Sequence, residues 1–167
     1  DPTGDVASLS SSFVPGGKQR KYLGAVDAHS GAATTWNPAP DGYIYGLLVA
    51  NGQLYVGGVF NNIGSVARKY LAAFTLSSGA ATAFDPAPDG VVNAMVVDSG
   101  NLYVGGNFTH ISGQPRNLIA ALDPLSGAAR IWNPAATPDV SYQVNALVVS
   151  DPQIIVGGSF GALAGVL

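Results

Sequence analysis

Apolar and polar side chains alternate through short runs of this chain, and the runs are separated by glycine, proline, asparagine or aspartate. In "VNAMVVD" (92–98) and "NLYVGGNF" (101–108) the alternation has a period of two, which is typical of β-strands. The dipeptide Ser99-Gly100 between them predicts a tight hairpin turn. "NLIAALDP" (117–124) and "AARIWNP" (128–134) follow, so this stretch predicts four consecutive antiparallel strands.

The same pattern returns along the chain at a regular interval. "QLYVGGVF" (53–60) and "QIIVGGSF" (153–160) repeat the second of these strands. The interval is 48 residues from Gly57 to Gly105 and 52 from Gly105 to Gly157, because four extra residues lie in "AATPDVSYQ". A four-stranded antiparallel unit that recurs every ~40 to 50 residues predicts a blade of a β-propeller.

Counting the repeats divides the chain into about three blades within one propeller segment, residues 1–167. We expect a partial blade at 13–42, two full blades at 43–90 and 91–139, and the first half of a blade at 140–167. Propellers close with at least about four blades. We therefore expect a partial propeller, completed by other blades of the same protein or by copies of this chain.

Residues that recur in every unit are expected to serve the blade itself. Glycine allows close approach where sheets crowd toward an axis, and this concerns Gly57, Gly105 and Gly157. Large rings fill the wedge between blades, and this concerns Trp36, Phe84 and Trp132. The repeated arginines are Arg20, Arg68 and Arg116. They either bridge to a carbonyl or carboxylate of their own or the next blade, such as Asp41 or Asp89, or form a ring of anion-binding donors.

The string "LYVGGNFTHISGQPRNLIAALDPLSGAARIWNP" (102–134) resembles a kelch-type repeat. It resembles more closely the delta-sixty class of propeller repeats found in bacterial surface and secreted proteins. The resemblance covers almost the whole chain from Phe13 onward. It implies a propeller of six or seven blades that acts as a scaffold or binding platform. We therefore expect an extracellular or cell-surface location.

Composition and charge narrow the function further. Glycine (22 residues) and proline (11 residues) are abundant and disfavour helices. The net charge of −3 and the scarcity of basic residues argue against a nucleic-acid partner. No run of 18 apolar residues occurs, so membrane insertion is not expected.

Residues capable of catalysis or metal binding are few. The chain has no cysteine, and its two histidines, His29 and His110, lie in different repeats without partners at metal-ligand spacing. We therefore expect no metal, no cofactor and no catalytic residue, and a non-enzymatic scaffold or binding module. The alternative is part of a propeller enzyme of the lyase, hydrolase or oxidase type, whose active residues lie outside this chain.

The places where the repeats differ are the candidates for a binding surface. They fall in the loops that join the second strand to the third and one blade to the next. The candidate residues for a protein or carbohydrate partner are His110, Gln114, Asp139, Tyr142 and Gln143. The alternative for the last three is that "AATPDVSYQ" is merely a tolerated surface insertion.

Overall fold

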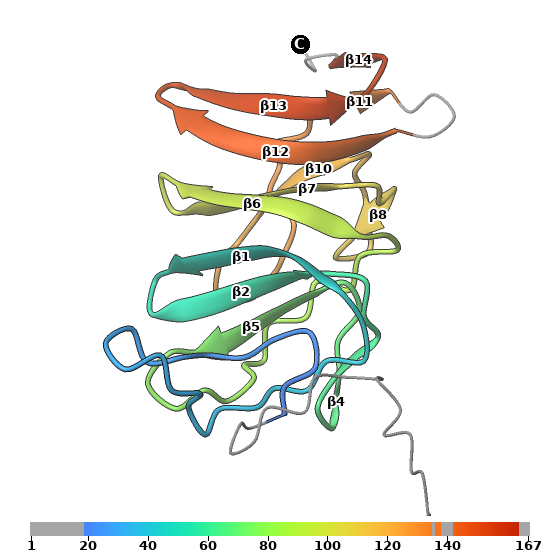
Figure 1. The fold of residues 1–167 in the computed structure, drawn as a ribbon. Helices are drawn as coiled ribbons and strands as arrows, with labels where there is room; N and C mark the ends of the chain where they lie inside the picture. Colours follow the sequence, from blue (N-terminus) through green and yellow to red (C-terminus); the bar gives the residue numbers. More distant parts are fainter. Residues whose placement is uncertain (1–18, 135, 138–141, 164–167) are drawn as a thin grey trace, which may run out of the picture.

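A computed structural model describes residues 19–134, 136–137 and 142–163 of the chain. These residues form antiparallel strands and contain no helix (Figure 1). None of them therefore forms a helix long and apolar enough to cross a membrane. The long strands belong to three sheets that lie one above the other in Figure 1, and the stack does not close on itself.

The first sheet has the order β1-β2-β5, the second has β10-β7-β6, and the third contains β12 and β13. Their bounds are β1 Ile44–Ala50, β2 Gln53–Gly58, β5 Leu71–Thr75, β6 Val92–Asp98, β7 Asn101–Gly106, β10 Ile119–Leu122, β12 Gln143–Ser150 and β13 Gln153–Ser159. The turns Asn51-Gly52 and Ser99-Gly100 each have two consecutive positive φ angles. This geometry is that of the type I′ turn, which suits the right-handed twist of a hairpin.

Each complete unit has a fourth segment, which follows its third strand (β5 or β10). This segment is not an extended strand. In the second sheet it pairs with β10 through the single bridge Leu122↔Ala129, and in the first sheet with β5 through Phe74↔Ala81. The sequence pattern predicted a full strand over 128–134. The pairing stops early because arginine side chains take the carbonyl groups further along these segments, as described below.

The loop between the second and third strands forms a small hairpin in both complete units, which the alternation of residues did not predict. In the first unit, β3 (Asn62–Ile63) pairs with β4 (Val66–Ala67). In the second, β8 (His110–Ile111) pairs with β9 (Gln114–Pro115). Both lie toward the right-hand edge of Figure 1, opposite the tight turns of the main strands. A further short pair, β11 (Ala136–Thr137) with β14 (Ala162–Leu163), lies along the same edge.

The apolar core lies between neighbouring sheets. One cluster joins the first sheet to the second and includes Tyr55, Leu71, Met95 and Leu102. Another joins the second sheet to the third and includes Tyr103, Ile119, Val144 and Leu147. Each sheet therefore buries both of its faces only where a sheet lies on either side of it.

The two adjacent glycines on each second strand have separate roles. A Cβ atom on Gly57 would lie 2.8 Å from the carbonyl oxygen of Val92 in the next sheet, so the first glycine permits close stacking. A Cβ atom on Gly58 would collide with the carbonyl oxygen of Tyr43, which directly precedes β1 of the same sheet. The strand pairing is irregular at this place, between Ile44 and Gly46.

Candidate functional site

The repeated arginines are engaged with backbone carbonyl groups of their own unit. Arg68 Nε donates a hydrogen bond of 3.0 Å to the carbonyl oxygen of Phe84, and its Nη2 donates one of 3.0 Å to that of Thr82. The guanidinium fork therefore holds the fourth segment where a strand would otherwise continue the ladder. Arg68 also forms an ion pair of 3.4 Å with Asp85.

The other two arginines lie in equivalent positions. Arg20 donates from Nε to the carbonyl oxygen of Trp36 over 2.9 Å and from Nη2 to that of Thr34 over 2.5 Å. Arg116 donates from Nη2 to the carbonyl oxygen of Arg130 over 2.8 Å. The partners are thus carbonyl groups rather than Asp41 and Asp89. The guanidinium N–H groups that donate to these carbonyl groups are directed at the chain's own backbone, and not at a shared site for an anion.

Asp89 instead fixes the base of the β8–β9 hairpin. Its Oδ1 accepts hydrogen bonds from the backbone N–H groups of Thr109 (2.7 Å) and His110 (2.9 Å). Its Oδ2 accepts one of 2.6 Å from Thr109 Oγ1 and lies 3.2 Å from His110 Nδ1. The connection between two units is thereby tied to the hairpin of the following unit.

Asp41 holds the base of the β3–β4 hairpin in the same way one repeat earlier. We call each of these sets of hydrogen bonds a hairpin clamp. Its Oδ1 accepts from the N–H groups of Asn61 (2.8 Å) and Asn62 (3.1 Å), and its Oδ2 accepts from Asn62 Nδ2 (2.8 Å). The hydrogen bond from the Asn62 side chain, followed by the two backbone bonds, lowers the pKa of Asp41.

The same chemistry acts more strongly on Asp89. Partial burial alone would raise the pKa of this carboxyl group, but the hydrogen bonds from Thr109 and His110 together outweigh burial and lower it to about 2. Asp89 is therefore ionised at neutral pH, and its charge strengthens the hydrogen bonds that hold the hairpin.

The structure brings two of the candidate binding residues together and leaves others apart. His110 and Gln114 are both exposed and lie on the paired strands β8 and β9. Tyr142 is partly buried and packs against the core between the second and third sheets. Gln143 is exposed at the start of β12, where its N–H group donates to Ser159 Oγ over 3.3 Å. Asp139 lies outside the described residues.

The repeated aromatic residues lie between sheets, but in different surroundings. Phe84 is fully buried and meets the ring of Tyr55 edge to face, with centroids 5.5 Å apart. Trp132 meets Tyr103 in the same way at 5.0 Å but is 37% exposed at the edge of the stack. Trp36 meets Phe74 edge to face at 5.5 Å, and its indole N–H donates to the carbonyl oxygen of Gly79 over 2.9 Å.

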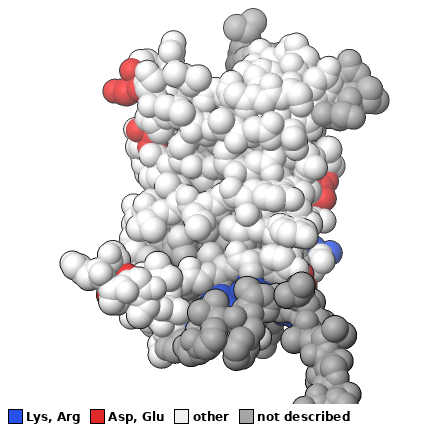
Figure 2. Space-filling view, in the orientation of Figure 1, with Lys and Arg blue, Asp and Glu red and all other residues white. Residues whose placement is uncertain are grey.

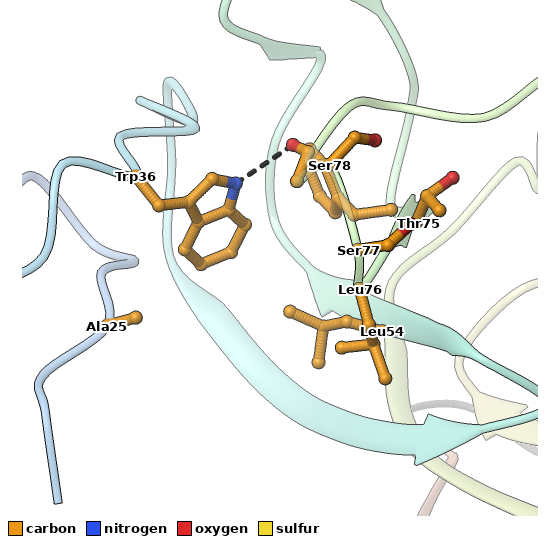
Figure 3. A pocket seen from close by; sticks show the side chains of 9 residues that line it. Ala25, Trp36, Leu54, Thr75, Leu76, Ser77 and Ser78 are labelled. Atoms are coloured by element: carbon orange, nitrogen blue, oxygen red, sulfur yellow. Dashed lines mark hydrogen bonds between the residues drawn. The ribbon is translucent and has the colours of Figure 1, made fainter.

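A hollow lies beside Trp36, and the sequence reasoning missed it. Its volume is about 350 Å³. Figure 3 shows Trp36 and Ala25 on one side of it and Leu54 and Leu76 on the other. The residues that line it are Ala25, Trp36, Leu54, Phe74 and residues 75–79. One feature of the sequence could have indicated the hollow. The tyrosine of the second strand, Tyr55 or Tyr103, has no counterpart in the polar stretch "DVASLSSSF".

Charge is sparse on the surface. Most of the face drawn in Figure 2 carries no Lys, Arg, Asp or Glu side chain, and the few carboxylates lie near its edges. Within the described part of the chain, no three His, Cys, Asp or Glu residues gather in a group able to hold a metal ion.

Comparison with protein families gives a match over part of the chain. A family model described as "Domain of unknown function (DUF5122) beta-propeller" matches residues 99–128, which run from the turn before β7 to the turn after β10. No curated protein and no solved structure matches the chain. With the all-β stack of antiparallel sheets, this match supports a β-propeller-type repeat protein, and the unclosed stack is consistent with a partial propeller.

Proposed function

We propose that this chain is part of a non-enzymatic scaffold or binding module of an extracellular or cell-surface protein. The binding surface is the hairpin face, defined as the β3–β4 and β8–β9 hairpins. Its partner is a protein or a carbohydrate. On this proposal the repeats belong to the kelch-like or delta-sixty type, and the ring is completed by further blades or by copies of the chain.

One observation carries the proposal: the base of each hairpin is held by an equivalent aspartate, whereas the side chains along its strands differ. Asp41 and Asp89 hold the two bases through equivalent hydrogen bonds. Between the two hairpins, Asn62 is replaced by His110 and Val66 by Gln114. A rigid support that presents variable polar side chains on loops is the arrangement by which scaffold folds create binding surfaces.

A hairpin exchange tests this function. The double variant His110→Asn and Gln114→Val gives the second hairpin the side chains of the first at these two positions and keeps Asp89 with the two backbone N–H groups that it accepts. The wild type and the variant are screened on an array of neutral and acidic oligosaccharides and on a panel of immobilised secreted proteins. We expect at least one specific signal with the wild type that falls tenfold or more in the variant.

The control changes the opposite edge of the sheets. Asn101→Ser alters the start of β7 next to the Ser99-Gly100 turn, and we expect it to leave the signal unchanged. A signal that survives the hairpin exchange, or is lost equally in the control, would place the binding surface elsewhere. Absence of any signal with the wild type would contradict the proposal for both classes of partner.

A further inference from the structure

The two ends of the stack expose apolar side chains at positions whose repeat equivalents inside the stack are buried or half-buried. On β1, Tyr45, Leu47 and Val49 are each more than half exposed. At the other end, Val148 of β12 and Ile155 of β13 face each other across the strands and are 55% and 53% exposed. Sheet faces of this kind are normally covered in a soluble protein.

The interface between the first two sheets shows how such faces fit together. Leu48 and Tyr55, which are the repeat equivalents of Val148 and Ile155, pack into the same cluster as Met95 of the second sheet. Met95 and Val97 are in turn the equivalents of the exposed Leu47 and Val49. The face that ends the stack at β13 is therefore equivalent to one half of an existing interface, and the face that begins it at β1 is equivalent to the other half.

The hollow beside Trp36 lies at the position that Tyr55 fills one repeat later. Between the first and second sheets, the Tyr55 ring contacts Phe84, and its hydroxyl donates a hydrogen bond of 2.8 Å to the carbonyl oxygen of Pro124. Phe84 and Pro124 are the repeat equivalents of Trp36 and Leu76, which line the hollow. The side chain expected in the hollow is therefore one from a second strand, at the position of Tyr55, Tyr103 or Ile155.

Residues 21–26 are not a regular strand, but they share backbone features with the third strands of the complete units, and Val26 bridges to Ala33 as Phe74 bridges to Ala81. Tyr22 has a φ of 61°, as does its equivalent Tyr70, and Leu118 has a φ of 64°. The Leu23 N–H group donates to the carbonyl oxygen of Lys21 over 2.7 Å, as Leu71 donates to that of Lys69 over 2.7 Å. In the described part of the chain, no second strand pairs with residues 21–26, and no third strand pairs with the outer edge of β13.

We propose that two copies of this chain close into one ring, with β13 of each copy pairing with residues 22–26 of the other. This inference rests on the propeller function proposed above and names the partner that completes it. The register follows from the pairs Ala73↔Tyr55 and Ala121↔Tyr103, which place Ala25 of one copy opposite Ile155 of the next. Ile155 then enters the hollow beside Trp36.

The number of copies follows from the count of sheets. The described residues contain two complete units and two complementary halves, so two copies of them give a ring of six blades. Propellers contain about four to eight blades, and three copies would give about nine. A two-fold ring also satisfies both ends of each chain with the same contact.

The other candidate to pair with residues 22–26 is the sequence before Phe13. Aligned on Phe13 and Phe60, it places Ser10 and Ser11 at the positions of Gly57 and Gly58. In the two complete units, a Cβ atom at the first glycine would come too close to the next sheet, and one at the second glycine would collide with backbone of its own sheet. β13 carries Gly157 and Gly158 there and fits the stacking without such a conflict.

The test begins with the mass of the wild-type chain in solution, measured by native mass spectrometry and sedimentation. We expect a species of twice 16.9 kDa. A monomer at all concentrations up to about 100 μM, or an assembly of three or more copies, would overturn the proposal. This measurement requires no variant and so does not depend on whether a variant folds.

Cross-linking then tests the register, because the natural chain has no cysteine. Separately prepared Ala25→Cys and Ile155→Cys chains are mixed and oxidised. Paired residues on neighbouring strands lie within disulfide reach. We expect a covalent dimer from the mixture and none from either variant alone. Leu125→Cys replaces Ile155→Cys in the matched control, since Leu125 is exposed but lies on a turn of the second sheet, and no dimer is expected.

A failure here is distinguishable from a failure of the proposed binding function. A monomeric chain whose hairpin face still binds its partner would refute closure by a second copy and leave the binding function intact. A dimer that gives no signal in the binding screen would do the reverse. Dimerisation without the Ala25–Ile155 cross-link would overturn the proposed pairing.

Discussion

The hydroxyl of Tyr55 donates a hydrogen bond of 2.8 Å to the carbonyl oxygen of Pro124, which belongs to the next sheet. The Tyr55 ring is itself fully buried against Phe84. One side chain therefore packs against Phe84 of its own unit and makes a directed polar contact with the next unit. Because the two sheets share no strand pairing, such side-chain contacts fix how one sheet is placed on the other.

Tyr55→Phe removes this hydrogen bond and keeps the ring. We expect a loss of about 0.5 to 1.5 kcal/mol in the free energy of unfolding, because the carbonyl group of Pro124 loses its partner. Urea unfolding followed by tyrosine and tryptophan fluorescence measures the change. Tyr103→Phe is the control, since its ring packs equivalently against Trp132, and we expect a smaller loss there. Equal losses in the two variants would contradict the role assigned to the Pro124 contact.

Gly57→Ala tests the close stacking of the sheets. Its Cβ atom would lie 2.8 Å from the carbonyl oxygen of Val92, so the two backbones must separate. We expect a loss of about 1 to 3 kcal/mol in unfolding free energy, as for overpacking in a core. Gly157→Ala is the matched control, because its Cβ atom would meet Ala146 Cβ at an ordinary 3.5 Å.

The control has a second use. Within one chain, Gly157→Ala is expected to leave the unfolding midpoint unchanged, provided that unfolding is measured at a dilution where single chains prevail. If a second copy packs on β13 as Val92 packs on Gly57, the same substitution weakens the association of copies. A variant with unaltered unfolding and a raised dissociation constant is the expected result.

Arg68→Lys tests how the fourth segment is held. Lysine keeps the charge but cannot donate to the carbonyl oxygens of Phe84 and Thr82 with one planar fork. We expect a loss of about 1.5 to 3 kcal/mol, the range for hydrogen bonds from a charged group. Arg130→Lys changes an arginine whose partner is the side chain of Asp123 and whose own side chain is half-exposed. Its effect should be about 0 to 1 kcal/mol in the same assay.

Asp89 gives the hairpin clamp a defined dependence on pH. Its pKa is lowered to about 2 in the folded chain from the ordinary 3.8, so the folded state binds fewer protons than the unfolded state between these values. The stabilisation is therefore fully present above about pH 4 and is lost as the pH falls toward 2. Because the carboxyl group is largely exposed, we expect a contribution of about 1 kcal/mol or less.

The measurement compares wild type with Asp89→Asn between pH 2 and 7. The difference in their unfolding midpoints should be constant above pH 5 and should shrink as the pH falls below about 4. A difference that grows on acidification would show that the charge of Asp89 does not support the hairpin.

Much of the fold could be predicted from the sequence, because it rests on local periodicity. Alternation of side chains and the turns Asn51-Gly52 and Ser99-Gly100 fix the hairpins within a few residues of chain. The recurrence of the "VGG" motif further shows that the same sheet is built again and must bury its faces against its neighbours. The all-β propeller type follows from these local rules.

The candidate site depended on contacts between segments far apart in the chain. No periodicity reveals that Arg68 reaches the carbonyl group of Phe84, or that Asp89 accepts hydrogen bonds from a loop about 20 residues later. The short β8–β9 hairpin likewise forms where an aspartate from the preceding connection can hold it.

The sequence by itself determined the repeating unit, its strands and its turns, because these depend on side-chain alternation and on the permitted φ angles of neighbouring residues. Only the tertiary structure decided that the fourth segments end in arginine contacts, that the hairpins face one edge, and that a hollow opens beside Trp36. These features arise when units stack, since their donors, acceptors and packing surfaces come from different parts of the chain.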